Sequence, residues 1–124
     1  MISQSTYWYM HIVGIALVIL SVGGVALHAM SGGTKESSGG RRLAAISHGL
    51  GLLLILTAGF GMLARLGVMH GGLPGWVWLK LVVWALIGAL YMIPYRRPEL
   101  AKIVWIVTPF LVLAAGWLAH SRAL

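Results

Sequence analysis

A single lysine interrupts an otherwise apolar stretch of the chain. Lys80 follows the aromatic pair Trp76 and Trp78 and precedes the almost entirely apolar run 81–91. A lysine deep in a membrane helix costs roughly 2.5–3.5 kcal/mol, so a membrane segment that keeps one is a candidate functional site. Trp76 and Trp84 stand four residues before and after it, on the same face of a helix. We expect them to flank the ammonium through cation–π contact, unless Lys80 snorkels toward the membrane surface.

Histidines are the other polar groups that could do chemistry. The chain has five: His11, His28, His48, His70 and His120. Depth along the predicted helices places His11 and His120 near the same membrane surface as Lys80. It places His28 and His48 together near the opposite surface. We expect His70 and His120 to be solvated loop or terminal residues.

The depth of these histidines indicates what they could bind. Histidines at equal depth on neighbouring helices can ligate haem iron, or a transition metal together with a third ligand. By depth, His28 and His48 are the pair that would serve a b-type haem if both faced the bundle interior. His11 and His48, each set among apolar neighbours, are candidate axial ligands of haem b or proton carriers, and His28 is a reserve ligand. His28 could instead contact lipid headgroups. Lys80, between its two tryptophans, would be the cationic partner of a propionate or another anion.

The sequence has only two acidic residues and no cysteine. The two acidic residues, Glu36 and Glu99, lie in predicted links, so no carboxylate within a span can neutralise Lys80 or couple transport to protons. The chain has no cysteine and lacks a HExxH helix and a phosphate-cradling loop. Its net charge of +7 sits mainly in short links, a pattern that favours anionic headgroups over nucleic acid.

Four apolar segments must position these residues. Of the 124 residues, 60% are hydrophobic and 9% are charged, which predicts an integral membrane protein with a single domain, 1–124. The predicted helices are 7–30, 43–66, 76–95 and 100–119, each long enough to cross the bilayer. Short links predict an all-α, antiparallel up-down four-helix bundle. Glycines on the first two helices are expected to let their backbones approach; these are Gly14, Gly23, Gly24, Gly51, Gly59 and Gly61.

Basic residues predict the orientation of the bundle. The link after the first helix carries Lys35, Arg41 and Arg42, and the link after the third carries two arginines followed by Lys102. Positive-inside counting therefore places both termini outside. In a bacterium, this is a multi-pass inner-membrane protein with periplasmic termini.

The helix order and its polar residues resemble a known set of small bacterial membrane proteins. The shared features are Tyr9-Met-His11, Ser47-His48-Gly49, Leu56-Thr-Ala-Gly59 and Val77-Trp-Leu-Lys80. Over nearly the whole chain the sequence resembles the SirB-like family and, more distantly, the HemJ-type protoporphyrinogen oxidases. The resemblance implies a four-helix inner-membrane bundle with these polar residues as its signature, and the HemJ-type relationship implies haem binding. The chain departs from the HemJ-type pattern at Ser21-Val-Gly-Gly-Val, where a tryptophan and an arginine are expected.

Two hypotheses from different classes follow. The first is a small inner-membrane protein that binds haem or a porphyrin, or serves as a redox accessory protein. The second is a cofactor-free structural or assembly subunit of a larger membrane complex, or of a homo-oligomer, which the small size and the glycines favour. A transport protomer would need an oligomer and a coupling residue.

Overall fold

The computed structural model describes residues 2–121 and is all-helical over that range. Its elements are α1 (Gln4–Met30), α2 (Arg41–Leu66), α3 (Gly75–Leu90), α4 (Ile93–Arg96), the 3₁₀ turn η1 (Pro98–Leu100) and α5 (Ala101–Ser121). Four helical segments are long and apolar enough to cross a membrane: Gln4–Met30, Arg41–Leu66, Gly75–Arg96 and Pro98–Ser121. The predicted all-α membrane bundle is confirmed, and the protein is a multi-pass membrane protein.

Local chemistry explains where the helices begin and end. The Ser3 hydroxyl accepts a hydrogen bond from the Thr6 amide at 3.1 Å, which caps α1 three residues before its predicted start. Gly67 ends α2 in the left-handed conformation, with φ of 69°. Pro94 cannot donate an amide hydrogen to the carbonyl of Leu90. Helix α3 therefore stops at Leu90, and the short α4 covers most of the remaining part of the predicted helix 76–95.

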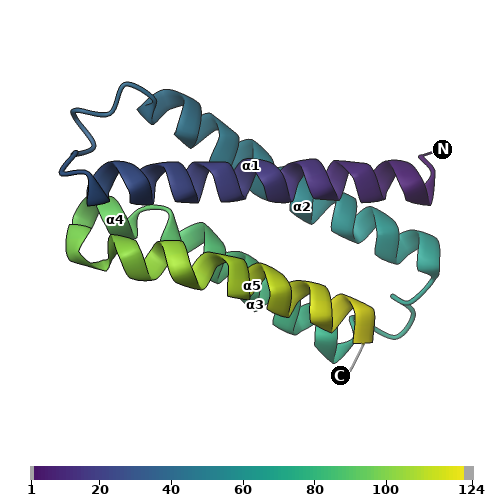
Figure 1. Ribbon diagram of the computed structural model, residues 1–124. Helices are drawn as coiled ribbons and strands as arrows, with labels where there is room; N and C mark the ends of the chain where they lie inside the picture. Colours follow the sequence, from purple (N-terminus) through teal and green to yellow (C-terminus); the bar gives the residue numbers. More distant parts are fainter. Residues whose placement is uncertain (1, 122–124) are drawn as a thin grey trace.

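Successive long helices run in opposite directions (Figure 1). Side-chain pairings follow the same rule, because His11 pairs with Ile55 and Ser21 pairs with His48 as one helix ascends and the other descends. One end of the bundle holds the start of α1, the link 67–74 and the end of α5, and is here called the 67–74 end. The opposite end holds the link 31–40 and α4, and is called the 31–40 end (Figure 1).

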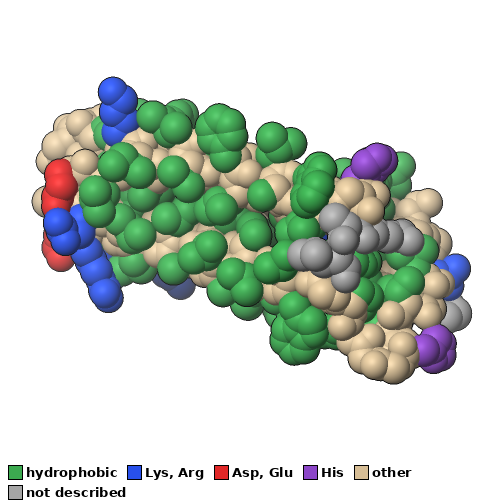
Figure 2. Space-filling model, turned by 90° about the horizontal axis from the view of Figure 1, so that it is seen from below, with side chains coloured by type: hydrophobic (Ala, Val, Ile, Leu, Met, Phe, Trp, Pro, Cys, Tyr) green, Lys and Arg blue, Asp and Glu red, His purple; other side chains and the backbone are tan. Residues whose placement is uncertain are grey.

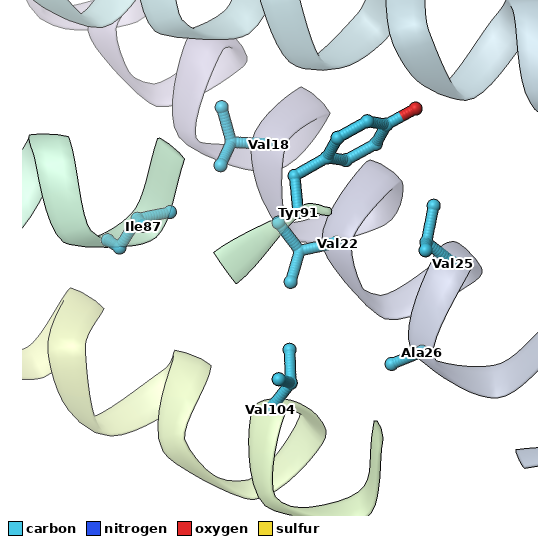
Figure 3. Close-up of a cluster of buried hydrophobic side chains, with 7 residues drawn as sticks. All are labelled: Val18, Val22, Val25, Ala26, Ile87, Tyr91 and Val104. Carbon is cyan, nitrogen blue, oxygen red and sulfur yellow. The ribbon is translucent and has the colours of Figure 1, made fainter. Parts of the chain in front are cut away.

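Two buried clusters hold the helices together. Toward the 31–40 end, α1 packs against the end of α3 and against α5 (Figure 3); the buried residues are Val18, Val22, Val25, Ala26, Ile87, Tyr91 and Val104. At the 67–74 end a second cluster joins α2, α3 and α5; its buried residues are Leu63, Trp76, Val77 and Leu118. Helix α1 contributes no residue to the second cluster.

The exposed surface fits a bilayer. Hydrophobic side chains cover the middle of the face shown in Figure 2, and most of its charged side chains gather at the end that holds α4. Large apolar residues on every long helix are exposed, among them Leu20, Leu53, Val82 and Phe110. Such a continuous apolar surface is stable only against lipid.

Candidate functional site

A cavity of about 570 Å³ lies between α1, α2, α3 and α5 on the side of the bundle toward the 67–74 end. Its walls are mostly apolar. The polar groups that line it are Gln4, His11, Lys80 and His120, together with the indoles of Trp8, Trp76 and Trp84. This volume and this balance of apolar wall and few polar groups are typical of small-molecule sites.

His11 presents one free ring nitrogen to the site. Its Nδ1 atom lies 3.0 Å from the Ile55 carbonyl oxygen on α2, which can only accept, so in the neutral ring Nδ1 carries the hydrogen and donates it. The Nε2 atom then keeps its lone pair, and it has no hydrogen-bond partner among residues 2–121. A Cβ built on Gly59 would lie 3.5 Å from the His11 ring, an ordinary contact distance, so the ring packs beside this position of α2. Metal-binding histidines are held in this way, by a bond from the other nitrogen to a carbonyl.

Lys80 lines the same cavity and is half-buried. The described part of the chain gives it no ion-pair partner. Glu99 pairs with Arg97 at the opposite end of the bundle, and Glu36 lies in the link 31–40. The ammonium therefore depends on an anion that this part of the chain does not supply.

The two tryptophans predicted to flank Lys80 both line the cavity. Trp76 is 7% exposed and belongs to the buried cluster at the 67–74 end. The Trp84 indole N–H donates to the Leu52 carbonyl at 3.1 Å, so this side chain bridges α3 and α2. Trp84 thus serves as a wall that ties two helices together beside the site.

Gln4 is a cavity residue that the sequence interpretation missed. Its side-chain oxygen is buried without a hydrogen-bond partner in the described part of the chain. A buried acceptor of this kind calls for a donor from a ligand or from water. The spacing Gln4, Trp8, His11 follows one face of a helix and was the signal that could have found it.

His48 lies outside the cavity, at a junction of three helices. Its Nε2 atom donates to the Gly88 carbonyl on α3 at 3.2 Å, and its Nδ1 atom lies 3.2 Å from the Ser21 hydroxyl on α1. The ring stacks on Tyr91, with centroids 4.3 Å apart and planes 14° apart. Both nitrogens are therefore used within the protein. The structure does not bring His48 and His11 to one site.

The His28 side chain is also hydrogen-bonded within the protein, to the neighbouring link 31–40. Its Nε2 atom donates to the Thr34 carbonyl at 2.8 Å and lies 3.2 Å from the Ser37 hydroxyl. These bonds close the link 31–40 onto the end of α1. The structure thus separates His28 from the cavity, where it would have served as a reserve ligand.

Two imidazoles line the cavity, the His11 ring held by the Ile55 carbonyl and the exposed His120 ring near the end of α5, together with the Lys80 ammonium. Within residues 2–121, no three His, Asp or Glu side chains lie together as a metal site would need. Comparison of the chain with family models, with curated proteins and with solved structures finds no match.

Proposed function

We propose that this protein binds an amphipathic anion, haem b or a related porphyrin, in the cavity between its four long helices. The proposal places it in a bacterial inner membrane with both termini in the periplasm, as a haem-binding or redox accessory protein. The observation that carries the proposal is that Lys80, which has no counter-ion among residues 2–121, and the Nε2 atom of His11, which has no hydrogen-bond partner there, line one cavity.

Each polar group has a role suited to such a ligand. The Lys80 ammonium offsets the charge of a propionate, and this pairing replaces the water that the ammonium loses in the membrane. His11 offers the only imidazole nitrogen of the described cavity wall that is oriented by a backbone bond and free to meet iron. The apolar walls cover the body of the ring system. Bound haem would supply one-electron redox chemistry.

If haem binds here, His11 would be its one iron ligand from the described residues of this chain, and Lys80 would hold a propionate. His48 would have to break its bonds to Gly88 and Ser21 and leave the Tyr91 ring before it could ligate iron. The expected pair of axial histidines is therefore replaced in this proposal by His11 alone. The buried Gln4 oxygen would accept a hydrogen bond from the ligand or from a water beside it.

Two probes separate charge recognition from iron ligation. Purified protein in detergent micelles is titrated with hemin and with iron-free protoporphyrin IX, followed by the Soret band and by porphyrin fluorescence. We expect Lys80→Met to lower the affinity for both hemin and protoporphyrin IX about tenfold, which is equivalent to about 1.4 kcal/mol of binding free energy. We expect His11→Ala to change the hemin Soret band while leaving the affinity for protoporphyrin within about threefold.

His70→Ala is the matched control, because His70 is exposed in the link 67–74 and does not line the cavity. It should bind both probes as the unmodified protein does. Binding of protoporphyrin without a Soret shift for hemin would contradict iron ligation by His11. A protein that binds neither probe would overturn the proposal and leave the cofactor-free structural subunit as the remaining hypothesis.

A further inference from the structure

The four helices around the cavity are not joined equally well at each boundary, or seam, between neighbouring helices. Helices α1 and α2 touch where Gly14 faces Gly51, since a Cβ built on Gly14 would lie 2.8 Å from the Gly51 carbonyl oxygen. Helices α2 and α3 are joined by the Trp84–Leu52 bond and, nearer the 67–74 end, by the cluster that contains Leu63. The same cluster joins α3 to α5. Side chains thus bridge three of the four seams between neighbouring helices beside the cavity, although the backbones of α2 and α3 approach each other closely at few positions.

Between α1 and α5, the described residues form no such bridge at the 67–74 end. Toward the 31–40 end the two helices pack, because Val104 meets Val22 and a Cβ on Gly23 would lie 3.2 Å from the Trp105 ring (Figure 3). Beyond that contact they diverge toward the ends that carry the two termini (Figure 1). The cluster at the 67–74 end includes Leu118 of α5 but no buried residue of α1.

The residues of α1 and α5 on either side of this seam are apolar, and several of them are exposed. On α1, three residues line the cavity and have large exposed fractions: Trp8 by 52%, Ile12 by 42% and Ile19 by 40%. On α5, Gly116 lines the cavity, and a Cβ built on it would meet nothing within 4 Å. These residues belong to helices long and apolar enough to span the membrane, so the opening faces hydrocarbon.

We propose that the ligand is an amphiphile dissolved in the bilayer, and that it enters the cavity sideways between α1 and α5. Its anionic group stays at the level of Lys80, near the membrane surface, while its apolar body passes from lipid into the apolar cavity without crossing water. This inference rests on the proposed function and narrows its ligand to compounds that partition into membranes. It also assigns Gly116 as the residue that keeps the passage open.

A reversible cross-link across the seam tests this route. Gly23 faces Trp105, so antiparallel spacing brings Ile12 to the level of Gly116. The chain has no cysteine, so Ile12→Cys with Gly116→Cys creates the only thiol pair. The protein is placed in phosphatidylcholine vesicles, bridged with a bis-methanethiosulfonate, and loaded with protoporphyrin IX. We expect loading and release to slow about tenfold or more, as for a closed lid, and to recover when the bridge is reduced.

The outcomes separate this inference from the proposed function. The reference is the same double variant with both thiols blocked by the monofunctional methyl methanethiosulfonate, which adds bulk at both positions without a bridge and should load and release faster than the bridged protein. If the reduced double variant binds no porphyrin while the unmodified protein also binds none, the proposed function fails, and the route fails with it. If porphyrin binds but the bridge leaves both rates within twofold of the reduced protein, the lateral route is wrong and the proposed function stands.

A second pair of variants covers the case in which the bridge disturbs folding. Gly116→Leu narrows the seam, whereas Gly24→Leu places the same side chain on α1 away from the cavity, and both built Cβ atoms meet nothing within 4 Å. We expect slower loading only for Gly116→Leu. Equal rates in the two variants would contradict the lateral route.

Discussion

At the scale of single residues, the structure gives two apolar-flanked histidines opposite roles. His11 uses one nitrogen to hold its ring against α2 and leaves the other free at the cavity. His48 is 7% exposed and uses both nitrogens to tie α1, α2 and α3 together. The first arrangement suits a ligand site, and the second suits a structural junction. Substitutions should separate these two roles.

His48→Ala should destabilise the fold without removing the site. The change deletes the part-buried bond to Gly88, the buried contact with the Ser21 hydroxyl and the stack on Tyr91, and it leaves the Gly88 carbonyl without its side-chain donor. We expect a loss of about 2–3 kcal/mol in the free energy of unfolding, measured by denaturation in mixed micelles. The folded fraction should still bind protoporphyrin. His28→Ala, whose bonds lie in an exposed link, is the control and should cost less than about 1 kcal/mol. Loss of porphyrin binding by folded His48→Ala would show that His48 belongs to the site.

At the scale of elements, the contact between α1 and α2 depends on two facing glycines. A Cβ on Gly51 would lie 2.7 Å from the Gly14 carbonyl oxygen, and backbone atoms cannot move aside as a flexible side chain can. The expected glycine packing is therefore real at Gly14 and Gly51. It is not general, because Gly24 has nothing within 4 Å of its built Cβ.

Gly51→Val should force α1 and α2 apart. We expect a loss of about 1–3 kcal/mol in the free energy of unfolding, as for other overpacked contacts. Gly49→Val is the matched control, since it lies on the same helix with nothing within 4 Å of its built Cβ. Equal stabilities of the two variants in mixed micelles would mean that the Gly14–Gly51 contact does not limit the approach of the helices.

At the scale of the whole molecule, one end is distinguished by charge. Arg96, Arg97 and Lys102 lie near α4, and three more basic residues lie between 35 and 42, so both groups belong to the 31–40 end. This asymmetry supports the proposed orientation, in which that end faces the cytoplasm. The cavity and Lys80 would then lie toward the outer leaflet.

Single cysteines can report this orientation in intact cells, because the chain has no native cysteine. We expect His70→Cys, in the link 67–74, to react with a membrane-impermeant maleimide added from outside. Gly39→Cys, in the link 31–40, should react only after the membrane is permeabilised. The reverse pattern would place the termini in the cytoplasm and contradict the positive-inside interpretation.

The sequence by itself determined the class of the protein and the depth of its polar groups. Four apolar runs separated by short links allow little besides a membrane bundle, because unpaired backbone groups are not tolerated in lipid. The position of each polar residue along its run then set its distance from the membrane surface. Depth along the helices therefore indicates a common level for Lys80, His11, Trp76 and Trp84 from the sequence alone.

Only the tertiary structure decided which way those groups face. Successive residues are rotated by about 100° around a helix, and membrane helices that are apolar on every side give little signal of orientation. His11 and His48 therefore looked equivalent in sequence, although one faces a cavity and the other a three-helix junction. The open seam between α1 and α5 was likewise invisible, since it arises from how two helices far apart in sequence diverge. The depth of a residue follows from its position along one helix, whereas the direction of its side chain and the route into the cavity depend on how the helices pack.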